Sequence, residues 1–115
     1  TGIDIEFSAD EKGDRFPIAV ENELLRIMQE ALNNIDKHAN ATCVEVQWAV
    51  NARDAQLRIT DNGDGFDESR GVRDTAFGLV GMRERAEVID AELVVTSSPG
   101  AGTSIDVVVP REERP

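Results

Sequence analysis

Three polar residues recur at helical spacing and could together handle a metal ion bound to phosphate. Glu30, Asn34 and Lys37 lie three or four positions apart, so at roughly 100° per residue they fall within about 60° of each other on a helix. His38 flanks this stripe. Carboxylate and amide oxygens are hard ligands that suit Mg²⁺, which takes its other ligands from water and phosphates, and Lys37 would add positive charge. The spacing also fits an ordinary amphipathic helix, or a simple pair between Glu30 and Asn34.

Two further polar residues end rows of apolar residues on strand-like segments. Asp61 shares the parity of Leu57 and Ile59, and Thr103 shares that of Ile105, Val107 and Val109, so both side chains should point inward. A buried carboxylate is costly unless something donates to it, and an exocyclic amine such as that of adenine would do so. Frayed, wet sheet ends are the alternative for either residue alone, but the coincidence of the two favours a pocket.

The glycines of Asp61-Asn-Gly63-Asp-Gly65 leave the backbone free to turn and allow a planar ring to approach without a Cβ in the way. Such a loop is common in proteins. Its acidic residues also suggest calcium, yet the spacing fails the EF-hand pattern, which needs oxygen ligands where Gly63 and Gly65 stand. Calcium is therefore excluded.

A second glycine pair, Gly78-Leu79-Val80-Gly81, precedes an apolar helical pattern. Unpaired N–H groups at the start of that helix could receive a phosphate. Arg83 and Arg85 follow, but each could equally pair with Glu84 or Glu87 on a solvated surface, and for Arg85 this pairing is the expectation.

Apolar periodicity predicts the elements that must position these residues. The pattern predicts an α+β fold, a two-layer sandwich with helices on one face of a mixed sheet. Its expected parts are a half-buried edge strand at Ile3–Phe7, a charged turn at Asp10–Arg15, a helix from Pro17 to about His38, hairpin strands at Val44–Val50 and around Leu57–Asp61 joined by the turn Asn51–Asp54, a helix at Leu79–Ile89, and closing strands at Leu93–Val95 and Thr103–Val109.

Composition limits the partners. A length of 115 residues predicts a single domain spanning 1–115. A net charge of −11 opposes a broad phosphate-binding surface and disfavours nucleic acid and direct membrane contact.

Cys43 is the only cysteine, which excludes an internal disulfide, and it is expected to be a plain small residue. The sequence has neither an apolar run of bilayer length nor a signal segment, which predicts a cytoplasmic domain. Its strand-like start suggests a piece of a longer protein.

Four ordered motifs carry a family resemblance that covers nearly the whole chain. They are QEALNNIDKHA, DNGDGF, GLVGMRERA and GAGTSIDVVVP. Together they resemble the ATP-binding catalytic domain of bacterial sensor histidine kinases, within the GHKL ATPase superfamily of gyrase, mismatch-repair and heat-shock chaperone ATPases. Lys37-His38 and the GLxGMRER form are most similar to the subfamily that acts with LuxR/NarL-type response regulators.

The resemblance implies a Bergerat fold that binds ATP and Mg²⁺. It implies that Asn34 holds Mg²⁺, that Glu30 polarises or accepts a proton near the attacking group, and that Lys37 and His38 reach the phosphates. Asp61 would accept from the adenine amine. The family's longer lid with its separate phenylalanine motif is not clearly matched, and Phe77 is a candidate substitute whose role stays open. The other implied contacts are Gly63, Gly65, Gly78, Leu79, Gly81, Met82 and Thr103 around the nucleotide, residues 71–78 as a lid, and Ile35, Ala39, Ile59, Met82 and Ile105 as apolar walls.

The implied reaction is transfer of the ATP γ-phosphoryl group to a histidine on the dimerisation domain of a longer parent kinase, which then serves a response regulator. His38, the only histidine, lies within the nucleotide motif and is not expected to be the acceptor. The isolated domain should be monomeric and nearly inert, and its parent either membrane-anchored or soluble. Two alternatives remain: a GHKL ATPase that hydrolyses ATP with Glu30, or a regulatory module with a decayed nucleotide site.

Overall fold

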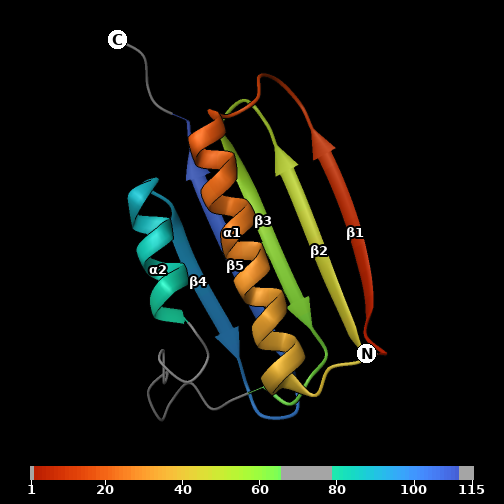
Figure 1. The fold of residues 1–115 in the computed structure, drawn as a ribbon. Coiled ribbons are helices and arrows are strands. Elements are labelled where there is room, and N and C mark those ends of the chain that lie inside the picture. The colour runs from red at the N-terminus through yellow and green to blue at the C-terminus, as the bar shows by residue number, and fades with distance from the viewer. Residues whose placement is uncertain (1, 66–78, 112–115) are drawn as a thin grey trace.

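The computed structural model describes residues 2–65 and 79–111, which form a two-layer sandwich of one five-stranded sheet with two helices on one face (Figure 1). This confirms the predicted fold class. Its elements in chain order are β1 (Asp4–Glu11), α1 (Ile18–Asn34), the short π-helical turn η1 (Ile35–Ala39), β2 (Cys43–Val50), β3 (Asp54–Asp61), α2 (Leu79–Val88), β4 (Glu92–Ser97) and β5 (Thr103–Pro110).

The strands follow the order β1-β2-β3-β5-β4, with β1 parallel to β2 and the other pairs antiparallel. A parallel pair needs a long crossover connection, and α1 supplies it. The central strand β3 ends at Asp61, which pairs with Val44 at the start of β2 and with Thr103 at the start of β5. The topology therefore brings three chain segments together at one sheet end.

The core lies between the sheet and the helices. Leu24, Ile27 and Ala31 recur at three- and four-residue spacing and are buried on α1, as an amphipathic helix requires. The expected face of α2 is also buried, through Leu79, Met82 and Ala86. The opposing sheet residues alternate with exposed or half-buried ones, and the buried set includes Val44, Val46, Leu57, Ile59, Ile105 and Val107.

The prediction for the first strand was partly wrong. β1 is an edge strand as expected, but it runs on to Glu11 into the predicted turn, and all of its residues are exposed. Ile5 and Phe7 remain 56% and 63% exposed, although their register with Val44 and Val46 puts them on the helix-covered face. The reason is coverage, because β1 lies beyond α1 (Figure 1). The alternation identified the face correctly but could not show that no helix covers it.

The first helix begins and ends close to the predicted positions, but its last turn changes geometry. Pro17 comes directly before the first residue of α1, where the missing N–H and fixed φ of proline are compatible with the start of a helix. After Asn34 the chain forms the π turn η1, which stops at Asn40 with φ 53° in the left-handed region. Lys37 therefore no longer follows the 100° spacing that relates Glu30 to Asn34.

Among the residues that the structure describes, neither helix is long and apolar enough to cross a membrane.

The different burial of Phe7 and Val46 gives a test of the layer arrangement. Phe7→Ser should change the free energy of unfolding by less than about 1 kcal/mol, because the side chain is mostly exposed. Val46→Ala, on the same face of the neighbouring strand and 1% exposed, should cost about 2 kcal/mol. Urea unfolding of both variants compares them, and equal losses would mean that Phe7 is buried in solution.

Candidate functional site

Three loops and the end of the first helix meet at one end of the sheet (Figure 1). Asp64 lies after β3, and its carbonyl accepts the N–H of Gly100 from the β4–β5 loop at 2.6 Å. The N–H of Asn62 donates to the carbonyl of Cys43 at 3.2 Å, joining the loop after β3 to the start of β2. Segments that are far apart in sequence are thus fixed to each other by their backbones.

Asp61 is buried at the centre of this region, with 5% of its surface exposed. Its Oδ1 accepts the N–H of Gly63 at 2.7 Å, and the backbone N–H of Thr103 also donates to its carboxylate. Burial raises the pKa of Asp61 above its ordinary value, while the two N–H donors oppose that rise. The inward direction of Asp61 predicted from strand parity is correct.

The donors to Asp61 differ from the sequence-based expectation, because the protein itself supplies two of them. An ionised carboxylate has about four lone-pair sites, so two protein donors leave capacity for a ligand amine. The carboxylate is thus held in one orientation and is still able to accept a further hydrogen bond.

Two glycines allow the loops to approach so closely. Gly65 has φ +66°, and a Cβ there would lie 2.1 Å from the carbonyl oxygen of Ser98. Gly102 has φ +75°, and its Cβ would lie 2.1 Å from the carbonyl oxygen of Asp61. Both positions require glycine because of their backbone conformation and because of these contacts. The atoms nearest to the place of a Cβ at Gly65 are therefore backbone atoms of Ser98 and Gly102.

Thr103 lies opposite Asp61 in the β3–β5 register and is half-buried. Its Oγ1 is 2.8 Å from the Oγ of Ser97, which also donates to the carbonyl of Gly102 at 3.1 Å. Ser97 is buried. These contacts fix the Thr103 hydroxyl against Ser97 of β4.

Asn62 was missed by the reasoning from sequence. Its side-chain oxygen accepts the N–H groups of Thr42 and Cys43, both at 2.9 Å, and its amide donates to Oγ1 of Thr42 at 2.9 Å. It therefore connects the loop after Asp61 to the start of β2. Asparagine is suited to such side chain-to-backbone bonds in turns, but the sequence does not reveal the partner.

Asn40 was also missed. Its Nδ2 donates to Oδ2 of Asp64 at 2.9 Å, which joins the end of η1 to the same loop. Its left-handed φ is a conformation that asparagine tolerates better than most residues. A single asparagine following a helical pattern was the signal available in the sequence.

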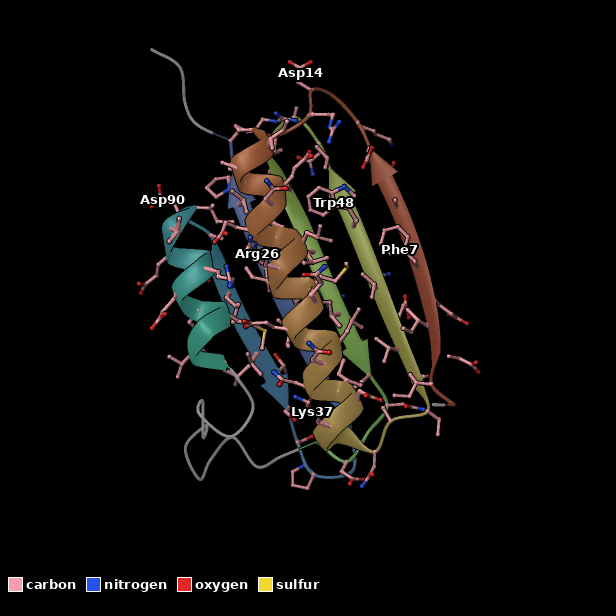
Figure 2. All side chains as sticks on the ribbon, in the orientation of Figure 1. Phe7, Asp14, Arg26, Lys37, Trp48 and Asp90 are labelled. Carbon is pink, nitrogen blue, oxygen red and sulfur yellow. The ribbon has the colours of Figure 1, made fainter. Side chains whose placement is uncertain are left out.

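The stripe on α1 is brought to this end of the molecule. Glu30 and Asn34 are half-buried and Lys37 is exposed, and Lys37 lies at the site end of the helix (Figure 2). His38 belongs to η1, although its side chain and that of Ala39 are outside the described part. Gly78 and Phe77, with the predicted lid at 71–78, also fall outside the described residues.

α2 contributes buried apolar residues and comes close to Glu30. Leu79 and Met82 are buried, as are the predicted wall residues Ile35, Ile59 and Ile105. A Cβ on Gly81 would lie 3.1 Å from Oε2 of Glu30.

The expected pairing of Arg85 with Glu84 or Glu87 is wrong. Arg85 instead reaches across to α1, where its Nη1 lies 3.4 Å from Oε1 of Glu23 and its Nε 3.8 Å from Oε1 of Glu30. Its side chain is 31% exposed, because it lies between the two helices. The correct partners are in another element, 62 and 55 positions away in sequence (85 − 23 and 85 − 30).

The donor chemistry fits a magnesium ion only if a ligand contributes most of the oxygens. Within residues 2–65 and 79–111, no group of three histidine, cysteine, aspartate or glutamate side chains could hold a metal. Glu30 and Asn34 instead offer one carboxylate and one amide, one helical turn apart. Mg²⁺ commonly uses one or two protein ligands together with phosphates and water.

Comparison with known proteins gives a match over most of the chain. Residues 19–113 match the family described as histidine kinase-, DNA gyrase B-, and HSP90-like ATPase. The signal transduction histidine-protein kinase/phosphatase DegS of Brevibacillus brevis is 42% identical over 96% of this chain, and the sensor histidine kinase LiaS of Bacillus subtilis 39% identical over 93%. The chain spans 28% of the length of each relative.

Solved structures share the fold. The ATP-binding domain of PrrB from Mycobacterium tuberculosis has a TM-score of 0.77 and 20% identity, covering 98% of this chain and 83% of that one. The blue-light activated histidine kinase of Erythrobacter litoralis EL346 has a TM-score of 0.72 and 21% identity, covering 92% and 35% of the two chains.

Alanine at the loop glycines should separate crowding from backbone strain. Gly100 has φ +77° but open space where a Cβ would lie, so Gly100→Ala should cost only the strain, about 1–2 kcal/mol. Gly102→Ala has similar strain and a backbone clash, and should cost about 1–3 kcal/mol more. Urea unfolding measures the difference. Equal costs would show that Gly102 and Asp61 are not in contact.

The raised pKa of Asp61 predicts a pH effect on stability. The folded chain keeps this proton to higher pH than the unfolded chain, so stability falls as pH rises from about 4 through the raised pKa. The Asp61→Asn variant lacks this dependence. Its free energy of unfolding minus that of the native chain should therefore rise as pH increases from about 4 through the raised pKa of Asp61, and then stay constant.

Urea unfolding at a series of pH values measures this difference, and carboxyl ¹³C NMR measures the pKa of Asp61 directly. A pKa at or below about 3.9, the ordinary aspartate value, would contradict the prediction.

Proposed function

Because the chain belongs to the family of histidine kinase-, DNA gyrase B- and HSP90-like ATPases, we propose that it binds ATP with Mg²⁺ and donates the γ-phosphoryl group to a histidine on a separate dimerisation domain. The observation that carries this proposal is the buried Asp61 carboxylate. It lies at the end of β3, fixed by Gly63 and Thr103, with acceptor capacity remaining.

Asp61 recognises the base. An adenine exocyclic amine is a donor, and a buried, oriented carboxylate forms a charge-assisted hydrogen bond with it. Thr103 lies opposite Asp61 in the β3–β5 register, and Gly63 provides the adjoining turn. Ile59 and Ile105 are paired directly across β3 and β5 and provide apolar surface for the ring.

Glu30, Asn34 and Lys37 serve the phosphate end. Asn34 holds Mg²⁺ together with the phosphates, and Lys37 contributes charge from the exposed end of the helix. When bound, the metal neutralises negative charge on the β- and γ-phosphates. Glu30 accepts a proton near the attacking group. His38, Gly78 and Gly81 complete this end as proposed phosphate contacts, with Gly65, Leu79 and Met82 lining the pocket.

In the reaction, a nitrogen of the acceptor histidine attacks the γ-phosphorus, the bond to the β-phosphate oxygen breaks, and ADP leaves. Such transfer depends on positioning and on stabilising charge rather than on covalent chemistry by the domain. His38 adjoins the site as part of η1, so the acceptor is proposed to lie in another domain. The chain alone would bind ATP and turn it over slowly.

The parent is proposed to be a two-component sensor kinase of which residues 1–115 form the catalytic domain. This agrees with the short share of the relatives that the chain spans. We place the domain in the cytoplasm as a monomer, and propose a LuxR/NarL-type response regulator as the final acceptor.

Calorimetry with ADP, in the presence and absence of Mg²⁺, tests the two ends of the site separately. Asp61→Asn should weaken ADP binding by about 10- to 100-fold with or without Mg²⁺, because it removes a charged hydrogen-bond acceptor. Asn34→Ala should mainly remove the magnesium-dependent gain. Asn33→Ala, an exposed neighbour on the same helix, is the matched control and should preserve that gain.

An unchanged magnesium dependence in Asn34→Ala would contradict the metal assignment. Absence of binding by the native chain at millimolar Mg-ADP would refute the proposed function and favour a regulatory module. Rapid phosphate release by the chain alone would instead favour an ATPase that uses water as its acceptor.

A further inference from the structure

Two residues of α2, the helix that packs beside α1, lie close to the Glu30 carboxylate. At Gly81 a Cβ would come within 3.1 Å of Oε2 and 3.5 Å of Oε1 of Glu30. Nε of Arg85 is 3.8 Å from Oε1 of Glu30. Gly81 and Arg85 are four residues apart, so both project from the same face of α2.

The backbone conformation at position 81 does not require glycine. It lies inside α2 without the positive φ seen at Gly65 and Gly102. Glycine is a poor residue in a helix interior, second only to proline. What alanine would disturb at this position is the Glu30 carboxylate, so the space is used by that side chain.

Arg85 lies between two carboxylates of α1. Its Nη1 donates to Oε1 of Glu23 at 3.4 Å, and Glu23 and Glu30 are two helical turns apart on one face. A guanidinium presents donors in a rigid planar fork, so the contact with Glu23 limits where the Nε group can point. Glu30 therefore has a fixed positive neighbour while 38% of its side chain remains exposed.

We propose that Arg85, together with the space left at Gly81, is a positioning device that fixes the Glu30 carboxylate for phosphoryl transfer. The inference rests on the proposed function, in which Glu30 accepts a proton. Arg85 acts through Glu30 and does not contact nucleotide. Its contacts with α1 explain why it is directed away from the phosphate role that its motif suggests.

A long glutamate side chain needs such support. It has three rotatable bonds, and a displacement of about 1 Å at a reacting group can reduce a rate by about 100-fold. Exposed ion pairs contribute little to stability, so removing Arg85 should affect the rate much more than the fold. That difference distinguishes positioning from a purely structural role.

The test measures phosphate transfer from ATP to the acceptor histidine in the full-length kinase, and Mg-ADP affinity by calorimetry. Arg85→Ala should slow transfer about tenfold or more with affinity changed less than about twofold, and Arg85→Lys should recover part of the rate. Glu23→Gln, which removes the charge of Glu23 but keeps an oxygen that can accept from Nη1 of Arg85, is the matched control and should keep at least half of the native rate. In a Glu30→Gln background, Arg85→Ala should have no further effect, because both changes act on one group.

Gly81→Ala gives a further check, with Mg-ADP affinity measured beside the rate because Gly81 is also a proposed phosphate contact. Alanine favours the helix but crowds Glu30, so the urea midpoint should be kept or raised while transfer slows. The proposal is overturned if Arg85→Ala leaves the rate unchanged, weakens Mg-ADP binding as much as it slows transfer, or adds its full effect to Glu30→Gln. Failure of the native protein to bind Mg-ADP or to transfer phosphate would refute the proposed function instead.

Discussion

The organisation of the site depends on one buried carboxylate. Asp61 ends the central strand β3, and burying its charge is costly unless donors surround it. The chain meets this requirement with main-chain N–H groups from Gly63 and Thr103, which belong to the following loop and to the neighbouring strand. Those donors are in reach only because Gly102 packs its backbone against Asp61 and Gly65 packs against Ser98. The glycines of these loops are therefore required to bring the hydrogen-bond donors close to the Asp61 carboxylate.

In the proposed function, the same arrangement separates two kinds of chemistry along one ligand. The sheet end would offer a carboxylate and a hydroxyl to a neutral, hydrogen-bonding base, whereas the end of α1 would offer Glu30, Asn34 and Lys37 to phosphates and a cation. A chain with net charge −11 repels an anionic nucleotide at long range. If the chain binds ATP as proposed, local backbone donors, a divalent cation and placed basic side chains must offset that repulsion.

Sequence periodicity predicted the core elements and the direction of Asp61, because parity along a strand fixes which face a side chain occupies. It did not predict that Ile5 and Phe7 would be exposed, since alternation identifies a face and not the layer that covers it. It also missed the π turn after Asn34 and the side chain-to-backbone bonds of Asn62. These depend on segments that meet only in the folded chain, as does the contact of Arg85 with α1.

Amide NMR of the chain titrated with Mg-ADP tests most directly whether nucleotide binds at the Asp61 end of the sheet. The largest shift changes are expected at Gly63, Gly65 and Thr103 and along the end of α1 near Asn34. Little change is expected at Arg111 and Asp14, which contact each other at the opposite end of the sheet. Saturable changes centred on Arg111 and Asp14, or no changes at millimolar ligand, would contradict the central claim that the Asp61 end of the sheet is the nucleotide site.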